Sequence, residues 1–285
     1  MTFYAQNVLN GLAYGSLLFL IAAGFTLIFG LMRVVNIAQT AFFLVGAYAG
    51  LTLLHAGLSF WVAAVLAGVA VMVIGLVTYR VFLHRYRADE LTALLLTLGV
   101  ALVLDDGALA IWGGDPQSVP PPEGLASSIR IGSLVFPSYW LALIAMSLLI
   151  AAALRLVERR TMLGAVIRAG VDDEEMARGL GIDVDRAFYV VFAIGAFLAG
   201  AGGVLGGPIT GAYPGLDGDL LPLAFAVIII GGIGSLEGAY IGSLIIGLVS
   251  TFGKALFPEL SYFTIFVPVA AIMALRPRGL LGRRR

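Results

Sequence analysis

Long stretches of apolar residues without a single charge constrain the fold of this chain more than any other feature. Residues 8–31 form the first such stretch, and a transmembrane helix needs about 20 consecutive apolar residues to cross the hydrocarbon core of a bilayer. Hydrophobic residues make up 60% of the chain and charged residues only 12%, more apolar surface than a water-soluble protein of this length could bury. The stretches have the length of helices, so the sequence predicts an all-α integral membrane protein.

The apolar stretches follow one another along the whole chain, which we interpret as a single membrane domain, 1–285. About 8–9 transmembrane segments are expected, some of them broken or re-entrant, because two of the apolar pieces are too short to cross a bilayer alone. After residues 8–31, the apolar stretches are 34–54, 58–83, 91–112, 134–157, 183–206, the short pieces 220–233 and 238–252, and 261–275.

The basic residues predict the orientation of these segments. All of the 17 lysine and arginine residues except Arg130 and Lys254 fall at the membrane side that contains residues 158–186. Cytoplasmic loops are enriched in Lys and Arg, so we place 158–186 and the basic tail 276–285 in the cytoplasm. The final Arg283-Arg284-Arg285 indicates contact with anionic membrane lipid rather than with nucleic acid.

The polar segment 158–186 contains a short pattern typical of a capped helix. Asp172 is expected to cap it, with Glu175 reaching back to the cap amide, and Glu174 adds negative charge to the first turn. Gly181 is expected to end the helix in a left-handed conformation. Ala177 has a small side chain that would permit close approach of a partner. The segment is either a docking site for a partner or an ordinary solvated connector, and the spacing favours neither.

Two polar breaks interrupt the apolar stretches, one early and one late. The early break contains Asn36, Gln39 and Thr40, and the late break contains Gly231, Gly232 and Ser235. Broken helices in two halves of a chain point to a structural repeat with a transport pathway between them, and free backbone groups at membrane depth could bind a zwitterionic solute. The alternative is that both breaks are surface loops, with Asn36 as a plain helix cap.

Several chemistries are excluded by what the sequence lacks. The chain has no cysteine and only two histidines, so no Cys- or His-based metal site is expected, and neither a cofactor nor a catalytic constellation is predicted. No phosphate-binding loop of the Gly-x-x-x-x-Gly-Lys type occurs, so the chain would not hydrolyse ATP itself. A secondary transporter coupled to H⁺ or Na⁺ is the alternative, and it would depend on Asp105, Asp106 or Glu237. For the two aspartates a helix end or an interhelical contact is favoured.

Three motifs together resemble the permease subunits of branched-chain amino acid ABC importers, of the LivH type. Near the N-terminus these are Asn10-Gly11-Leu12 and Val35-Asn36-Ile37-Ala38; in the polar segment, Glu175-Met176-Ala177 with Gly181 four residues later; and near the C-terminus, Gly231-Gly232-Ile233-Gly234-Ser235 with Gly238-Ala239. The chain departs from the family at Gln39-Thr40, where the family usually has His-Gly, and at Met176 and Gly179 in the polar segment.

The resemblance implies a set of partners and a location. It implies a second homologous permease subunit, two cytoplasmic ATP-binding subunits and an extracytoplasmic solute-binding protein, in a bacterial or archaeal cytoplasmic membrane. The residues of the polar segment would couple the permease to the ATPases, and the two breaks would border the pathway. The solute would be a branched-chain or other small apolar amino acid, or a related solute such as urea, an amide or an aromatic acid.

Overall fold

The computed structural model describes residues 2–32, 34–86, 89–131, 134–277 and 279–282, and within them the chain is almost entirely helical. Among these residues, seven helices are long and apolar enough to cross a membrane. They are α1 (Thr2–Met32), α2 (Ala38–His55), α3 (Phe60–Thr78), α5 (Glu90–Trp112), α6 (Ser138–Arg160), α9 (Val184–Thr210) and α11 (Leu236–Leu256). A π-helical turn, Tyr79–Leu83, joins α3 to the short α4 (His84–Tyr86). The predicted all-α membrane fold is confirmed.

Two apolar helices are too short to cross a bilayer alone. α10 (Leu216–Gly231) has 16 residues and α12 (Ser261–Leu275) has 15. At a rise of 1.5 Å per residue they are roughly 24 Å and 22 Å long, against a hydrocarbon core of about 30 Å. The expected short piece 220–233 corresponds to α10. The expected short piece 238–252 instead lies within α11, whose 21 residues are long enough to cross a membrane, and the expected last span 261–275 is the short α12.

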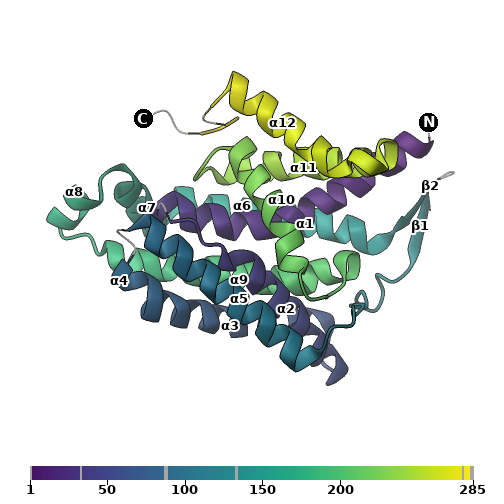
Figure 1. Ribbon diagram of the computed structural model, residues 1–285, viewed down its shortest axis with the longest axis horizontal. Helices are drawn as coiled ribbons and strands as arrows, with labels where there is room; N and C mark the ends of the chain where they lie inside the picture. The colour runs from purple at the N-terminus through teal and green to yellow at the C-terminus, as the bar shows by residue number, and fades with distance from the viewer. Residues whose placement is uncertain (1, 33, 87–88, 132–133, 278, 283–285) are drawn as a thin grey trace.

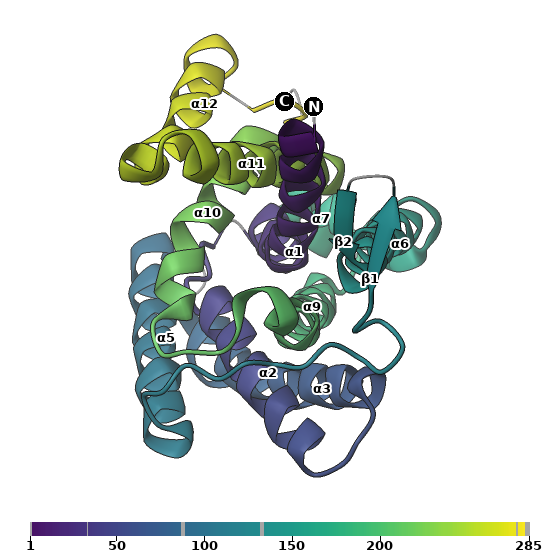
Figure 2. The same cartoon turned by 90° about the vertical axis from the view of Figure 1, so that its right-hand side faces the viewer.

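The helices are arranged with the polar segment and the N-terminus at opposite ends of the molecule. Figure 1 shows α4, α7 (Met162–Asp172) and α8 (Glu174–Gly179) at one end, and the N-terminus with the strands β1 (Ser128–Ile131) and β2 (Leu134–Pro137) at the other. Viewed from the end that carries the strands, α1 and α9 lie in the middle of the other helices (Figure 2). Accordingly, α1 packs against α6, α9, α10 and α11. Of the residues in its most apolar 18-residue stretch, 83% are buried.

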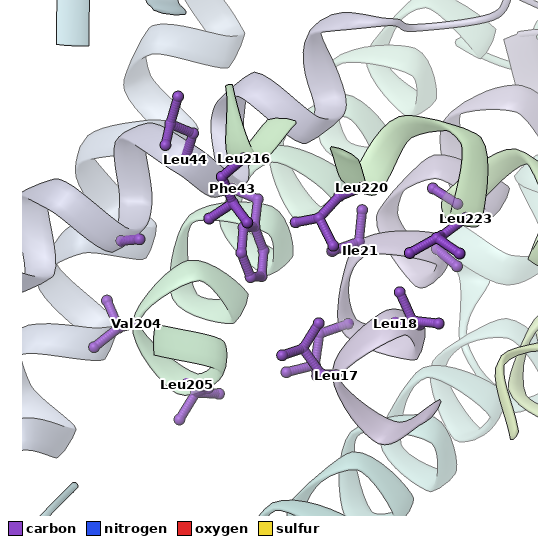
Figure 3. Packing of buried hydrophobic residues seen from close by; sticks show 14 of the residues in the cluster. Leu17, Leu18, Ile21, Phe43, Leu44, Val204, Leu205, Leu216, Leu220 and Leu223 are labelled. Carbon is purple, nitrogen blue, oxygen red and sulfur yellow. The ribbon is translucent and has the colours of Figure 1, made fainter. Parts of the chain in front are cut away.

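Apolar side chains from α1, α2, α9 and α10 meet in the largest core cluster. Figure 3 shows Phe43 of α2 between Leu216 and Leu220 of α10 on one side and Leu17 of α1 on another. All of these side chains are buried. Because α10 is too short to cross the bilayer alone, its packing against α1 and α2 helps to fix its position.

Glycines allow α2 and α9 to cross with their backbones in contact. A Cβ on Gly46 of α2 would overlap the carbonyl group of Gly200 of α9, and a Cβ on Gly203 would overlap that of Phe43. Small residues at a crossing let two helices approach closely, which is the main packing device between helices in lipid. At this crossing, glycine is needed because the two backbones are in direct contact.

A β-hairpin precedes α6 where the sequence predicted a loop followed by a span from residue 134. β1 pairs antiparallel with β2, with Ser128 opposite Pro137 and Ile131 opposite Leu134. The side chain of Ser138 donates hydrogen bonds to the carbonyl oxygens of Leu125 and Ser127, and α6 begins at this serine. The predicted start of the fifth span is thus four residues too early, because β2 uses residues that are apolar enough to pass for membrane helix.

The polar segment 158–186 contains two helices where the sequence predicted one. Thr161 caps α7 by accepting a hydrogen bond from the amide of Gly164 at 3.2 Å. Apolar side chains of α7, including Val166 and Ile167, pack against a core cluster formed mainly by α1, α2 and α9. α7 follows the end of α6 directly, and α8 follows α7.

Candidate functional site

The cap of α8 is Asp173 rather than the predicted Asp172. The Asp173 Oδ1 atom accepts a hydrogen bond from the amide of Met176 at 2.9 Å, whereas Asp172 is the last residue of α7. With Asp173 as the cap, the third helical position is Met176, so the predicted reciprocal bond from Glu175 to an Asp172 cap does not form. The prediction of an acidic first turn is confirmed, because Glu174 and Glu175 both lie there.

Gly181 follows the end of α8 in a left-handed conformation, as the sequence predicts. Gly181 has a φ of +81°, a value that side-chain-bearing residues rarely adopt. Its amide donates to the carbonyl oxygen of Arg178 at 2.9 Å, and the amide of Ile182 donates to that of Ala177 at 3.0 Å. This pair of bonds is the Schellman arrangement, which satisfies the carbonyl groups at a helix end.

The side chain of Ala177 faces the interior of the protein, contrary to the expectation that it faces a partner. It is 3% exposed and belongs to the same core cluster as Val184 and Phe188 of α9. Met176 and Leu180 are instead 61% and 73% exposed. The small side chain of Ala177 therefore permits close packing of α8 on its own chain, and the exposed apolar surface of α8 is made by Met176 and Leu180.

Arg178 ties α8 to the start of α9. Its guanidinium group donates to Glu174 at 3.1 Å and, through two separate nitrogens, to the two carboxylate oxygens of Asp185 at 3.0 Å and 2.7 Å. These hydrogen bonds, with that to Asp185 dominant, raise the pKa of Arg178. A bidentate pair fixes direction as well as distance, so α8 is oriented relative to α9.

The early break is a buried polar network. Gln39 donates to the carbonyl oxygen of Gly195 on α9 at 2.9 Å, and Asn36 donates to the side chain of Gln39 at 3.5 Å. The amide of Ile37 donates to the hydroxyl of Thr97 on α5, which in turn donates to the carbonyl oxygen of Val35, both at 3.2 Å. Thr97 of α5 thus satisfies backbone groups of the break, and the Gln39 side chain ties the break to α9.

The structure corrects one prediction about the early break and adds one residue to its contacts. Asn36 is not a helix cap, because the residue before α2 is Ile37 and no side chain caps this helix end. Thr97 belongs to the break although it was not a predicted site residue, and nothing local in the sequence connects it to position 37. Thr40 is buried beside Gln39 and contacts the carbonyl oxygen of Ile37 at 3.4 Å.

The late break lies between α10 and α11 and is covered by the C-terminal segment. Ser235 caps α11 by accepting from the amide of Gly238 at 3.0 Å. The carbonyl oxygens of Ile230 and Gly231 accept hydrogen bonds from the amides of Leu280 and Leu281 at 2.8 Å and 3.1 Å. Residues 279–281 of the predicted tail therefore dock on the break, while Arg283-Arg284-Arg285 lie outside the described residues.

Gly232 and Gly279 form the closest point of this contact. Gly232 has a φ of +97°, and a Cβ on Gly279 would come within 2.6 Å of the Gly232 Cα. Gly279 itself has a φ of +76°. Gly232 and Gly279 therefore both need to be glycine for the two backbone segments to come this close.

A large cavity of about 1350 Å³ is bordered by residues next to both breaks. Val35 comes from the early break, and Ile233 and Gly234 come from the late break. Gly234 also touches α1, since a Cβ on Gly30 would lie 2.8 Å from its Cα. The six predicted pathway residues do not themselves line this cavity, so the structure brings together the neighbours of the two breaks rather than the predicted side chains.

The walls of the large cavity are mostly apolar. Examples are Leu27, Phe29, Leu94 and Ile229. Three charged residues also line the cavity: Glu90, Glu158 and Arg168. Apolar walls with a few polar groups are typical of sites for small organic ligands.

Asp105 and Glu237, two of the three acidic residues that could have served ion coupling, make structural contacts. Asp105 accepts a hydrogen bond from the amide of Gly215 at 3.2 Å, so it makes the predicted interhelical contact, whereas α5 does not end there but continues to Trp112. Glu237 at the start of α11 pairs with Arg155 and Arg159 of α6 at 2.8 Å and 2.7 Å. Glu237 is therefore neutralised by two arginines of the same chain.

These features define a class of protein: a multi-pass, all-helical membrane permease. The chain belongs to the family described as the permease component of branched-chain amino acid transport systems, whose model matches residues 7–274. It is thus a transport subunit of the ABC type and not an enzyme, and an ion-coupled secondary transporter is not favoured. The family implies ATPase and substrate-binding partners.

Relatives from bacteria and archaea align along nearly the whole chain. The chain is 29% identical to the high-affinity branched-chain amino acid transport system permease protein BraD of Pseudomonas aeruginosa, covering 98% of this chain and 96% of BraD. It is 28% identical to LivH of Escherichia coli (strain K12), covering 99% and 96%. A probable LivH of Methanocaldococcus jannaschii is 27% identical, covering 97% and 92%.

A solved structure, "PsaBC from Streptococcus pneumoniae in complex with Fab", matches with a TM-score of 0.47 and 15% identity. The match covers 93% of this chain and 89% of the matched chain.

Proposed function

We propose that this permease imports a branched-chain or other small apolar amino acid, or a related solute. The observation that carries the proposal is the large cavity, which both helix breaks border and whose walls are mainly aliphatic, with one aromatic residue, Phe29. Such walls suit the apolar side chain of a solute of this class. The names of the relatives BraD and LivH support the same solute class.

The six predicted break residues lie behind the residues that line the cavity, and we propose that they hold these lining residues in place. Asn36, Gln39 and Thr40 hold the early break to α9, while Gly231, Gly232 and Ser235 shape the late break. Movement of either break would change the cavity. The internal repeat that would relate the two breaks is part of this proposal.

α8 is the proposed coupling element. Met176 and Leu180 offer an exposed apolar surface to a groove on an ATP-binding subunit. Glu174 and Glu175 complement the positive end of the helix, Gly181 turns the chain away, and Ala177 seats the helix on α9. Asp172 acts by ending α7 immediately before the cap of α8.

The assembly proposed for this chain contains a second homologous permease subunit, two cytoplasmic ATP-binding subunits and an extracytoplasmic solute-binding protein. The chain acts as one permease domain, 1–285, in a bacterial or archaeal cytoplasmic membrane, with residues 158–186 and the tail 276–285 in the cytoplasm. The distribution of arginine supports this orientation.

Uptake by cells that express the complete transporter tests the solute and the energy source together. We expect labelled leucine to accumulate, to be displaced by isoleucine and valine, and to stop when ATP is depleted while the proton gradient is kept. Urea, acetamide and benzoate are the competitors that represent the other solute classes. Uptake that follows the proton gradient and ignores ATP would contradict the proposal.

A variant of the early break tests the pathway. Asn36→Leu is expected to lower uptake while the amount of permease in the membrane stays close to normal, because only a 3.5 Å hydrogen bond to Gln39 is lost. Such a bond contributes about 1 kcal/mol to stability. Stimulation of ATP hydrolysis by the solute should fall with uptake. Normal uptake in this variant would remove Asn36 from the pathway.

A further inference from the structure

A second, smaller pocket lies near the end of the molecule that carries the β-hairpin. It has a volume of about 340 Å³ and is formed where the beginning of α1 meets the end of α11, with Trp140 of α6 and Ile209 of α9 completing the wall. It is far along both helices from the large cavity, which borders the opposite end of α1. None of its residues has been used in the transport proposal.

A single positive charge dominates this pocket. Lys254 is the only lysine in the chain, and its Nζ atom lies 5.4 Å from the centre of the Tyr14 ring. No carboxylate side chain lines the pocket, and among the described residues Lys254 has no ion pair. An ammonium group without a counter-charge at the edge of an apolar medium attracts an anion.

Neutral hydrogen-bonding groups surround the lysine. Asn7, Asn10, Ser250 and Thr251 all line the pocket. Ser250 is 1% exposed, so its side chain lies at the buried side of the pocket rather than at its mouth. Hydroxyl and amide groups in these places can donate hydrogen bonds to an anionic ligand beside Lys254.

The surroundings of the pocket are those of a membrane interface. Tyr14 and Trp140 in its wall are the amphipathic aromatic residues that concentrate at the level of lipid headgroups. Exposed apolar side chains flank it on the same two chain segments, with Tyr4 and Val8 on α1 and Phe257 just after α11. A ligand with an anionic group and hydrocarbon chains fits this combination better than a free anion does.

We propose that this pocket binds the phosphate group of an anionic phospholipid, with Lys254 as counter-charge and Ser250 and Asn10 as hydrogen-bonding partners. The acyl chains lie against the exposed apolar residues of α1 and of the segment after α11. The proposal does not depend on which solute the permease transports. A different role for Lys254 is to complement the negative end of α11, where it occupies the last turn, and that role needs no ligand.

Lipid titration of the full-length chain in detergent, followed by native mass spectrometry, separates these roles. The probes are phosphatidylglycerol, phosphatidylcholine and inorganic phosphate. We expect one tightly bound phosphatidylglycerol per chain, with affinity about fivefold lower in Lys254→Gln and largely kept in Lys254→Arg. Ser250→Ala, a small change that preserves packing, should also weaken binding.

Arg130→Gln is the matched control, because Arg130 is the other basic residue placed at the same membrane side and lies on β1, outside the pocket. It should leave phosphatidylglycerol binding unchanged. Equal lipid affinity in Lys254→Gln and the parent chain would overturn the proposal. Binding of inorganic phosphate that is as tight as that of the lipid would overturn the assignment to a phospholipid.

Discussion

Arg178 in α8 and Asp185 in the first turn of α9 are joined by a bidentate ion pair, with nitrogen–oxygen distances of 3.0 Å and 2.7 Å. The pair connects the proposed coupling helix directly to a helix that crosses the membrane beside α1, α2 and α3. Both side chains are partly exposed, with relative accessibilities of 38% and 36%. The pair therefore contributes more to the direction of α8 than to the stability of the fold.

Breaking this pair should uncouple transport with little loss of stability. For Asp185→Asn we expect a several-fold fall in uptake while ATP hydrolysis continues, because α8 loses its fixed orientation. An exposed pair contributes at most about 1 kcal/mol, so thermal unfolding of the purified chain should shift only slightly. Arg186→Ala changes a neighbouring exposed arginine outside the pair and is the control. Normal coupling in Asp185→Asn would show that the pair has no role in transmission.

Gly181→Val should abolish transport while the protein stays in the membrane. No atom lies within 4 Å of a Cβ at this position, so the cost comes from the backbone conformation alone, about 1–3 kcal/mol for a branched residue at positive φ. The end of α8 would shift, and with it Leu180. Gly179→Ala is the control, because Gly179 is helical with open space around it and alanine favours the helix by about 1 kcal/mol. Uptake should be measured beside the membrane level of each variant.

Gly46→Leu should destabilise the fold strongly. Its side chain would overlap the carbonyl group of Gly200, which forces α2 and α9 apart, and overpacking of this kind costs about 1–3 kcal/mol or more. Gly99→Ala in α5 has no atom within 4 Å of its Cβ and should be neutral or slightly stabilising. Unfolding temperatures of the two purified variants give the comparison. A small shift for Gly46→Leu would mean that the crossing can open at little cost.

Gly279→Val should release the C-terminal segment from the late break. A Cβ there would press on the Gly232 backbone at 2.6 Å, and the positive φ adds strain. The hydrogen bonds of Leu280 and Leu281 to α10 would then be lost. The chain has no native cysteine, so Leu280→Cys can report the release by thiol labelling. We expect faster labelling in the Gly279→Val background, and an unchanged rate would contradict the contact.

Thiol labelling also tests the orientation of the chain. Pro121→Cys lies in the connection between α5 and β1, and Leu180→Cys lies at the end of α8. In intact cells without an outer membrane barrier, an impermeant reagent should label position 121 and leave position 180 unlabelled until the inner face is exposed. The reverse pattern would overturn the orientation predicted from the arginine distribution.

Local sequence was enough to identify features that depend on a few adjacent residues. The length and apolarity of the stretches predicted membrane helices, since both requirements come from the bilayer itself. Gly181 ends α8 as expected, because a left-handed residue after a helix favours glycine whatever surrounds it. The family resemblance was also carried by short motifs and is confirmed by the match over residues 7–274.

Only the tertiary structure decided which of several neighbouring candidates takes each role. The sequence 172–173 offers two aspartates, and Asp173 is the cap because α7 continues through Asp172. Ala177 faces inward because α8 packs on α9, and Thr97 meets Ile37 because α5 lies beside α2. The docking of residues 279–281 on the late break joins two segments remote in sequence. Such contacts depend on which faces meet when the helices assemble, and no local rule contains that information.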